Sequence, residues 1–322
     1  MIRSMRRLLG ALALVALLVP ASAAALLTPG RTVSSPAPVT ALSVTHQSVI
    51  WAVGRSKRDC GRVRLWETWS KGLWTFGDKT IVGCEEGPSG GFGIAQVAST
   101  GRRAFWVTNI GGNITDYQLW TATPTRPSPK RLAFASAETG AAPAIVLGVG
   151  TPEGVPYAVG STVTYLGPDG SRLFRADLDS PVRLLAAGPS FGTGRVIAAL
   201  ENGDVTVLSK TGARLRTDTY EPDAVRAVQL AYGGPVVQVG DDVTIGSPTT
   251  GTNVTLPHGA LMLDYRERAI VYRKGTQARL RAIGSGADTL LQQFALKPWQ
   301  PMLISLDWGF GWAKGATVYW RT

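Results

Sequence analysis

The sequence predicts an all-β fold built from a repeated unit, and three observations support this prediction. Glycine and proline, which favour turns, account for 38 and 20 of the 322 residues. Short apolar runs follow the period-two pattern of strands, and the 3.6-residue period of helices is absent after the N-terminal segment. Groups of three or four such runs recur at intervals of 36 to 53 residues.

The repeated unit is clearest between residues 195 and 216. An apolar strand, 195–200, is followed by Asn202-Gly203, a pair typical of tight hairpins. Valines alternate with other residues along the next strand, and Gly212 supplies the positive φ of the following turn. In the preceding unit, Pro168 stands second in a sequence typical of a type I turn, 167–170.

Seven such modules follow one another, beginning near residues 41, 94, 144, 182, 225, 261 and 302. The strands expected in the first three modules are 41–44, 49–53, 62–66, 73–76; 94–97, 104–107, 117–120, 131–134; and 144–147, 157–159, 163–166, 172–174. Those expected in the last four are 182–185, 196–199, 205–208, 213–216; 225–228, 236–239, 243–245, 253–256; 261–264, 269–272, 278–282, 290–294; and 302–305, 310–313, 318–320. Repeats of roughly 40 to 50 residues with four strands each are typical of propeller blades. The predicted fold class is therefore a seven-bladed β-propeller of four-stranded antiparallel blades.

The seventh module has only three recognisable strands, because the sequence stops at Thr322. One extended stretch, 31–34, precedes the first module and belongs to none of them. We expect it to pair with 318–320 as the outer strand of the last blade. Residues 26–322 would then form a single propeller domain closed by an N-terminal strand.

The N-terminal segment has the three parts of a secretory signal. Arg3, Arg6 and Arg7 precede the apolar stretch 8–19, and small residues follow at 21–25. We expect residues 1–25 to be a signal peptide cleaved after Ala23 or Ala25, so that the protein is secreted or lies in the cell envelope. The alternative is an uncleaved membrane anchor, because 8–27 is uncharged and nearly reaches the roughly 20 residues that a span needs.

Charge points to an acidic partner. The formal net charge is +11, and loss of the three N-terminal arginines lowers it to +8. Such a charge favours acidic partners, namely an anionic polysaccharide, a wall polymer, lipid headgroups or nucleic acid. No run of five or six basic residues is present, so the alternative is a soluble surface with scattered arginines, and no nucleic-acid partner is expected.

Cys60 and Cys84 are the only cysteines. An even pair in an exported chain predicts one disulfide, here closing a loop of about two dozen residues in the first module and stabilising it by about 3 kcal/mol. Their spacing is not that of a zinc or redox motif.

Candidate site residues are few. His46, His258 and the pair Asp241-Asp242 are interpreted as turn residues, and no Gly-x-Ser-x-Gly sequence occurs. The glycines at 148–154 lack a following helix and so do not form a dinucleotide loop. Most of the ten tryptophans fall on strands and are assigned to the core, whereas Trp69 and Trp299 are the candidates for a ligand-binding face.

Trp66 and Trp120 each end the third strand of a module. We expect them to occupy equivalent, largely buried places in neighbouring blades.

The third strand, turn and fourth strand of the modules resemble a known repeat. They are clearest at 163–174 and 205–215, with a weaker copy at 243–251. These units resemble the blades of pyrroloquinoline-quinone-type and WD-repeat-like propellers. The tryptophan that follows the turn in that family is Phe174 in one copy and missing in the others, no Trp-Asp pair closes a blade, and quinone-binding residues cannot be placed. The resemblance therefore implies a propeller without a cofactor that serves as a rigid interaction disc.

Two functions are compatible with the sequence. The first is an exported, non-enzymatic binding scaffold, monomeric, with a protein or an anionic polymer as its partner and membrane contact only through an uncleaved N-terminus. The alternative is an extracellular propeller enzyme, a glycan- or lactone-directed hydrolase or lyase. Three or more acidic or histidine side chains converging at the channel would favour the enzyme.

Overall fold

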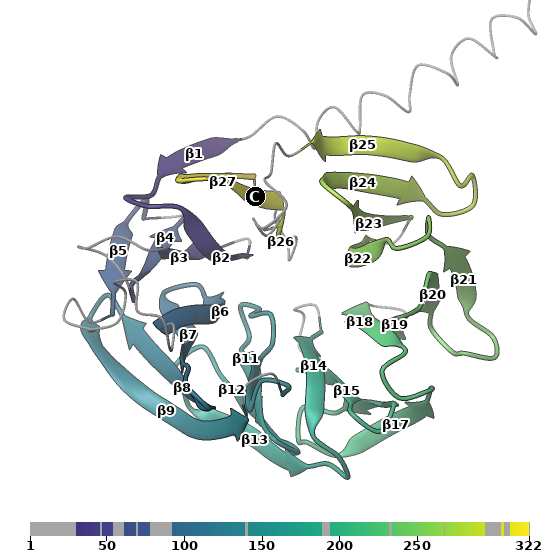
Figure 1. Cartoon of the computed structure of the whole chain (residues 1–322), viewed down its shortest axis with the longest axis horizontal. Helices are drawn as coiled ribbons and strands as arrows, with labels where there is room; N and C mark the ends of the chain where they lie inside the picture. Colours follow the sequence, from purple (N-terminus) through teal and green to yellow (C-terminus); the bar gives the residue numbers. More distant parts are fainter. Residues whose placement is uncertain are drawn as a thin grey trace, which may run out of the picture.

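Seven four-stranded antiparallel sheets form a ring in the computed structural model of the chain (Figure 1). The structure describes residues 30–45, 47–53, 61–68, 70–77, 92–138, 141–188, 194–231, 234–266, 268–293, 304–305 and 310–321. These residues contain strands and turns but no helix, and hence no helix able to span a membrane. The predicted seven-bladed β-propeller is confirmed.

Each sheet is one blade, numbered here in chain order. Blade 1 contains β2 (Val39–Val44), β3 (Ser48–Val53), β4 (Val63–Glu67) and β5 (Leu73–Phe76). Blade 2 contains β6 (Phe92–Thr100), β7 (Arg103–Ile110), β8 (Ile114–Thr123) and β9 (Arg126–Glu138). Blade 3 contains β10 (Ile145–Leu147), β11 (Val155–Val159), β12 (Thr162–Leu166) and β13 (Arg172–Asp177).

The remaining blades follow the same plan. Blade 4 contains β14 (Val182–Ala187), β15 (Val196–Leu200), β16 (Asp204–Leu208) and β17 (Arg214–Thr219). Blade 5 contains β18 (Val225–Ala231), β19 (Gly234–Val239), β20 (Asp242–Ile245) and β21 (Thr252–Thr255). Blade 6 contains β22 (Leu261–Arg266), β23 (Ala269–Lys274), β24 (Gln277–Ala282) and β25 (Asp288–Gln293), and blade 7 contains β26 (Ile304–Ser305), β27 (Phe310–Lys314), β28 (Thr317–Arg321) and β1 (Arg31–Ser34).

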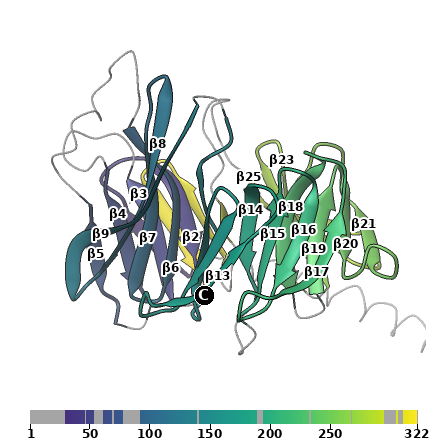
Figure 2. The same ribbon diagram turned by 90° about the horizontal axis from the view of Figure 1, so that it is seen from below.

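The apolar core lies between neighbouring blades. Every residue of β3 and β15 is buried, because a second strand is covered on both faces by the adjacent sheets. One cluster joins blades 3 and 4 through Val163, Tyr165 and Val196, and another joins blades 1 and 2 through Leu65 and Trp106. Seen from the side, the strands of each blade stand side by side around the ring (Figure 2). Outer strands such as β17 instead alternate between exposed and half-buried residues.

The turns that the sequence predicted are present. Gly203 and Gly212 have φ values of 91° and 84°. The amide of Gly170 donates to the carbonyl of Gly167 at 2.9 Å, which closes the predicted turn around Pro168.

The ring is closed by the N-terminal strand, as predicted. β1 pairs antiparallel with β28, with Arg31 opposite Trp320 and Ser34 opposite Thr317. Beyond the strand, the amide of Ser35 donates to the carbonyl of Ala316 at 2.7 Å. Figure 1 shows β1, in purple, beside the yellow strands of the C-terminus. Strands from the two ends of the chain therefore share one sheet.

Candidate interaction surface

A channel of about 350 Å³ lies where the first strands of six blades meet. Its lining comes from β2, β6, β10, β14, β18 and β22 and is mainly alanine, valine and leucine. The polar lining residues are Thr40, Ser43, Gln96, Gln229 and Asp264. Among the described lining residues, Asp264 is the one carboxylate.

The longer polar side chains of the channel join neighbouring blades. Gln96 of blade 2 accepts a hydrogen bond from the amide of Leu147 in blade 3 at 2.5 Å. Gln229 of blade 5 accepts from the amide of Tyr265 in blade 6 at 2.7 Å and donates to Asp264 at 2.6 Å. These groups are therefore engaged in holding the innermost strands in register.

Gln238 makes a similar junction inside the wall. It is fully buried and donates to the carbonyls of Gly240 and Ala260, both at 2.8 Å, while its oxygen accepts from the amide of Met262 at 2.7 Å. This joins β19 to the start of β22. Sequence analysis missed this residue, although one glutamine inside the valine-rich run 236–239 is a signal that a buried amide has partners.

Asp241 and His258 are turn residues, as predicted, whereas Asp242, also expected in the turn, is the first residue of β20. Asp241 accepts from the amide of Gly259 at 3.0 Å, and His258 Nδ1 lies 2.8 Å from its other oxygen. The hydrogen bonds from His258 and Gly259 hold the pKa of Asp241 below its ordinary value. The described residues contain no group of three or more His, Cys, Asp or Glu side chains that could hold a metal ion.

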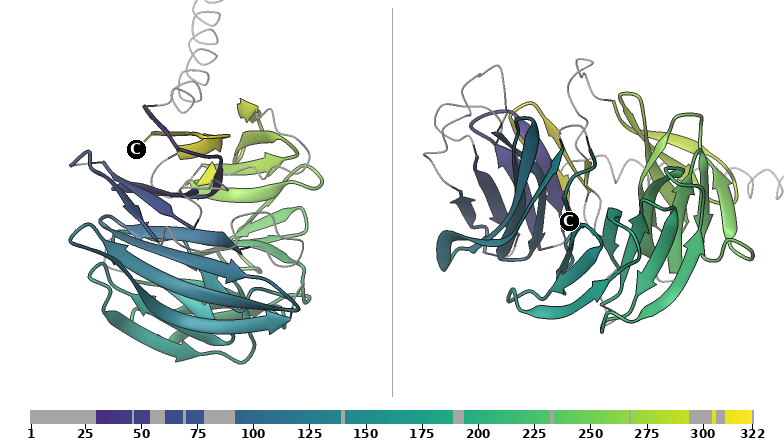
Figure 3. Two further views of the ribbon diagram at one scale, coloured as in Figure 1. Left: turned by 60° about the vertical axis from the view of Figure 1, so that its left-hand side comes forward. Right: turned by 60° about the horizontal axis from the view of Figure 1, so that its bottom comes forward.

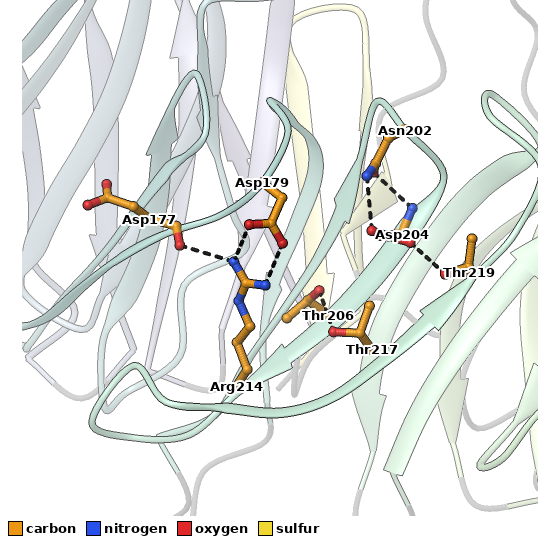
Figure 4. Close-up of polar contacts among 8 residues, drawn as sticks. All are labelled: Asp177, Asp179, Asn202, Asp204, Thr206, Arg214, Thr217 and Thr219. Atoms are coloured by element: carbon orange, nitrogen blue, oxygen red, sulfur yellow. Dashed lines mark hydrogen bonds and ion pairs between the residues drawn. The ribbon is translucent and has the colours of Figure 1, made fainter.

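Acidic side chains on the third and fourth strands have partners of their own. Figure 4 shows Asp204 accepting from the hydroxyl of Thr219 at 2.6 Å in blade 4. Equivalent pairs at 2.6 Å join Thr162 to Asp177 in blade 3 and Thr255 to Asp242 in blade 5. These carboxylates serve as cross-strand contacts.

Four arginines connect successive parts of the ring. Arg214 forms a two-point ion pair with Asp179, at 2.5 and 2.9 Å, which lowers the pKa of that carboxyl (Figure 4). The other contacts run from Arg102 to Glu67, from Arg103 to the carbonyls of Pro168 and Asp169, and from Arg183 to Asp223 and the carbonyl of Val225. Part of the positive charge is thus used within the propeller.

A second set of cations remains on the outer strands of blades 2 and 3, whereas both arginines of the blade 4 outer strand are ion-paired, Arg214 to Asp179 and Arg216 to Asp218. We define the rim surface as the exposed residues Arg126, Lys130, Arg131, Phe134, Arg172, Leu173, Arg175 and Leu215. Phe134, Leu173 and Leu215 are 50 to 52% exposed, although all three are large and apolar.

An Arg-Leu pair recurs on the outer strands of blades 2, 3 and 4. Arg131-Leu132, Arg172-Leu173 and Arg214-Leu215 occupy the bulge of their outer strands, because each leucine is skipped in the pairing with the third strand. A bulge re-aims side chains and bends the strand. It turns Leu173 and Leu215 outward, whereas Leu132 is half-buried against the blade 2–3 core.

The rim surface has the properties of a site for an acidic partner. Within the described part of the chain, Arg126, Lys130 and Arg172 have no acidic side chain in ion-pair contact, and the guanidinium of Arg131 lies 5.8 Å from the centre of the Phe134 ring. Unpaired cations beside exposed apolar groups supply both electrostatic attraction and contact area.

Five residues singled out from the sequence, Trp69, Trp299, Cys60, Cys84 and His46, lie outside the described residues, as does the signal segment 1–25. The proposed disulfide and ligand-binding aromatics therefore stay predictions.

Trp66 and Trp120 are described, and both lie on the side of their blade that faces the preceding blade. Trp66 packs in the blade 7–1 cluster and Trp120 in the blade 1–2 cluster. Their expected equivalence is thus supported, but both are only half-buried. Each packs against its cluster with part of its surface exposed, so its burial is less complete than that of Trp51 and Trp106, which are 0% and 2% exposed.

Solved structures share this fold at low sequence identity. The chain is similar to a component of the mitotic checkpoint complex, with a TM-score of 0.56, 14% identity and 92% of each chain covered. It is also similar to Chaetomium thermophilum Raptor, with a TM-score of 0.53, 13% identity and 90% of this chain but 28% of that chain covered, and to Saccharomyces cerevisiae Sqt1, with a TM-score of 0.51, 10% identity and coverage of 90% and 97%. No protein-family model and no curated protein sequence matches the chain.

These likenesses show a propeller with WD40-like structural neighbours. The finer expectation, a quinone-type repeat family, finds no support in a family match and stays a prediction.

Proposed function

We propose that the protein is an exported, non-enzymatic propeller that binds an acidic protein through its rim surface. The observation that supports this proposal best is the set of exposed cations without an acidic partner on β9 and β13, Arg126, Lys130 and Arg172, beside exposed apolar side chains on β9, β13 and β17. The channel offers less to a partner, since Gln96, Gln229 and Asp264 are already bonded to one another or to neighbouring blades.

The structural neighbours are consistent with a protein partner. One of them comes from the structure of a multiprotein assembly, the mitotic checkpoint complex. The closed ring with its joined ends would give such a partner a rigid platform, which lowers the entropic cost of binding. Charge would also speed the encounter, because the net charge of +8 that remains after loss of the three N-terminal arginines attracts an acidic protein at long range.

Export is the part of the proposal that depends on residues 1–25. Fractionation of cells producing the full chain, with N-terminal sequencing of the product, tests it. We expect the protein outside the cytoplasm with a new N-terminus after Ala23 or Ala25. An intact N-terminus in a cytoplasmic fraction would contradict export.

Cross-linking in the producing cells tests the binding site. We expect a partner protein cross-linked to Lys130, and its loss in the triple variant Arg126→Glu, Arg131→Glu, Arg172→Glu, which keeps the cross-linked lysine. The matched control reverses three exposed cations elsewhere, Arg195→Glu, Lys274→Glu and Lys314→Glu, and so changes net charge equally. Equal loss in both variants would show attraction by overall charge, and capture of a polysaccharide in place of a protein would contradict the proposal.

A further inference from the structure

We infer that the outer edge of β9 is a docking strand, which takes an extended acidic segment of the partner protein as a fifth strand of blade 2. This inference rests on the proposed function and specifies how one part of the rim surface engages its partner.

β9 differs from the other outer strands in length. It has 13 residues, whereas β1, β5, β13, β17, β21 and β25 have 4 to 6. It is the last strand of its sheet and, among the described residues, pairs only with β8. The long strands of blade 2 run across the outside of the ring in the left panel of Figure 3. An edge of this length presents a row of backbone donors and acceptors to a further strand.

The two halves of β9 differ in how readily their backbone can pair with an added strand. The first half contains Pro127, Pro129 and three cations, features that keep edges from pairing indiscriminately. The second half, residues 132–137, has no charged residue and no proline. Ala133 and Ala135 pack on the blade 3 side, so small side chains leave the backbone edge accessible. Backbone pairing with an added strand is thus favoured along the second half. The cations of the first half select for a segment that carries acidic residues.

The chemistry of the occupant follows from the side chains along this strand. Phe134 is half exposed and lies opposite Gln118 of β8. Lys130 and Arg131 precede it by four and three residues, which is roughly 10 to 13 Å along a strand. A segment that adds to β9 would place an apolar residue beside Phe134 and acidic residues beside the two cations. Strand addition of this kind draws affinity from the backbone and specificity from alternate side chains.

A second copy of the chain is the other possible occupant. Antiparallel pairing of two β9 strands would place Arg131 near Glu138 of the other copy, but it would also bring together two mature chains of net charge +8. Because like charges oppose association, the acidic segment is the better fit.

The test uses a fluorescein-labelled peptide of alternating valine and threonine with one phenylalanine and, four residues away, a pair of glutamates. A second peptide is identical in sequence but N-methylated at alternate residues, which removes backbone donors and keeps every side chain. Fluorescence anisotropy with the full-length mature protein should show binding of the first peptide and at least about tenfold weaker binding of the second. Equal binding of the two peptides, or binding of neither, would overturn strand addition.

Charge-reversal variants test whether the peptide binds at β9. We expect Lys130→Glu with Arg131→Glu to weaken the first peptide about tenfold, and Arg195→Glu with Lys274→Glu, a matched reversal of two exposed cations away from the rim surface, to weaken it no more than about twofold. Hydrogen exchange should slow at residues 132–137 when the peptide binds and stay unchanged in β25. Equal effects of the two reversals, or protection elsewhere, would move the site away from β9.

The oligomeric state completes the test. Sedimentation should show a monomer that the peptide does not alter. A dimer that dissociates on adding the peptide would assign the edge to a second copy. If the peptide does not bind but the cross-linked partner is still lost in the rim variant, the docking strand is refuted. The proposal that the rim surface binds the partner is then retained.

Discussion

Gly203 and Gly160 both lie in the turn between the second and third strands of their blades, a three-residue turn in blade 4 and a two-residue turn in blade 3. Both have positive φ, 91° and 55°. The two positions differ in the room they leave for a side chain. A Cβ at Gly203 would lie 2.1 Å from the carbonyl oxygen of Tyr220, whereas a Cβ at Gly160 would meet nothing within 4 Å. A positive φ alone costs a non-glycine residue roughly 1–2 kcal/mol.

We therefore expect Gly203→Ala to lower the free energy of unfolding by about 3 kcal/mol or more, and Gly160→Ala by about 1 kcal/mol. Urea denaturation of the two variants measures the difference. Equal losses would mean that the contact with Tyr220 relaxes freely and that backbone conformation alone sets the cost.

Glu67 makes part of the stability dependent on pH. Burial raises the pKa of its carboxyl, but hydrogen bonds from Arg102 and Ser70 lower it by more, so the pKa lies below its ordinary value. A carboxyl whose pKa is lowered in the folded state stabilises the protein above its unfolded pKa, near 4.3, and loses this contribution as pH falls through the folded pKa.

Thermal unfolding at several pH values tests this. The wild-type Tm should fall as the pH drops below about 4.3, and Glu67→Gln, which cannot ionise, should lose less over the same interval. Arg102→Gln should resemble it, because Arg102 bonds Glu67 at 2.8 Å. If the wild type and both variants show parallel curves, the pair makes no pH-dependent contribution.

Among the elements, the third strands of blades 1 and 2 offer a direct test of blade equivalence. The ring of Trp66 lies 5.8 Å from that of Trp320 across the blade 7–1 boundary, and Trp120 donates to the hydroxyl of Thr108 at 3.1 Å. Because both are half-buried, Trp→Ala at either position should cost about 2–4 kcal/mol, somewhat less than for a fully buried tryptophan.

Chemical denaturation compares these two variants with Trp51→Ala, whose side chain is fully buried. We expect Trp51→Ala to cost more than either. A loss near zero at Trp66 or Trp120 would contradict their equivalent roles at the two blade boundaries.

The limits of sequence reasoning are clear in β9. The strand was expected at 131–134 and spans Arg126–Glu138. Pro127 and Pro129 are residues that a central strand excludes, because proline removes a ladder donor in the middle of a sheet. At an outer edge one side of the strand needs no partner, so proline is tolerated there. The apolar pattern reveals strands covered by neighbouring blades, whereas an exposed strand is defined by pairing that no local pattern shows.

At the scale of the whole molecule, the net charge follows from the sequence, but which cations are ion-paired and which are free does not. A charge of +11 predicts an acidic partner, yet Arg102, Arg103, Arg183 and Arg214 contact other parts of the ring. Their partners lie 35 to 66 residues away in sequence, so only the folded ring separates them from Lys130 and Arg172 on the rim.

Ring closure, in contrast, followed from counting strands. A seventh blade with three strands leaves an edge, and an unpaired edge invites aggregation, so one further strand had to come from elsewhere in the chain. The four paired positions of β1 and β28 supply it, and Val33 packs against the blade 7–1 core that contains Val318 and Trp320.

A chain beginning at Pro38 would lack this strand and the hydrogen bond from Ser35 to Ala316. At about 0.5–1.5 kcal/mol for each hydrogen bond, we expect it to lose about 3–6 kcal/mol and to melt roughly 10 °C lower, with aggregation through the exposed edge of β28. A chain beginning at Gly30 keeps β1 and is the matched control, with an expected Tm close to that of the mature protein. Differential scanning calorimetry and light scattering of the two chains measure both effects. If the chain beginning at Pro38 melts with the control, β1 does not hold the ring closed, because a strand that closed the ring would leave blades 7 and 1 less stable when removed.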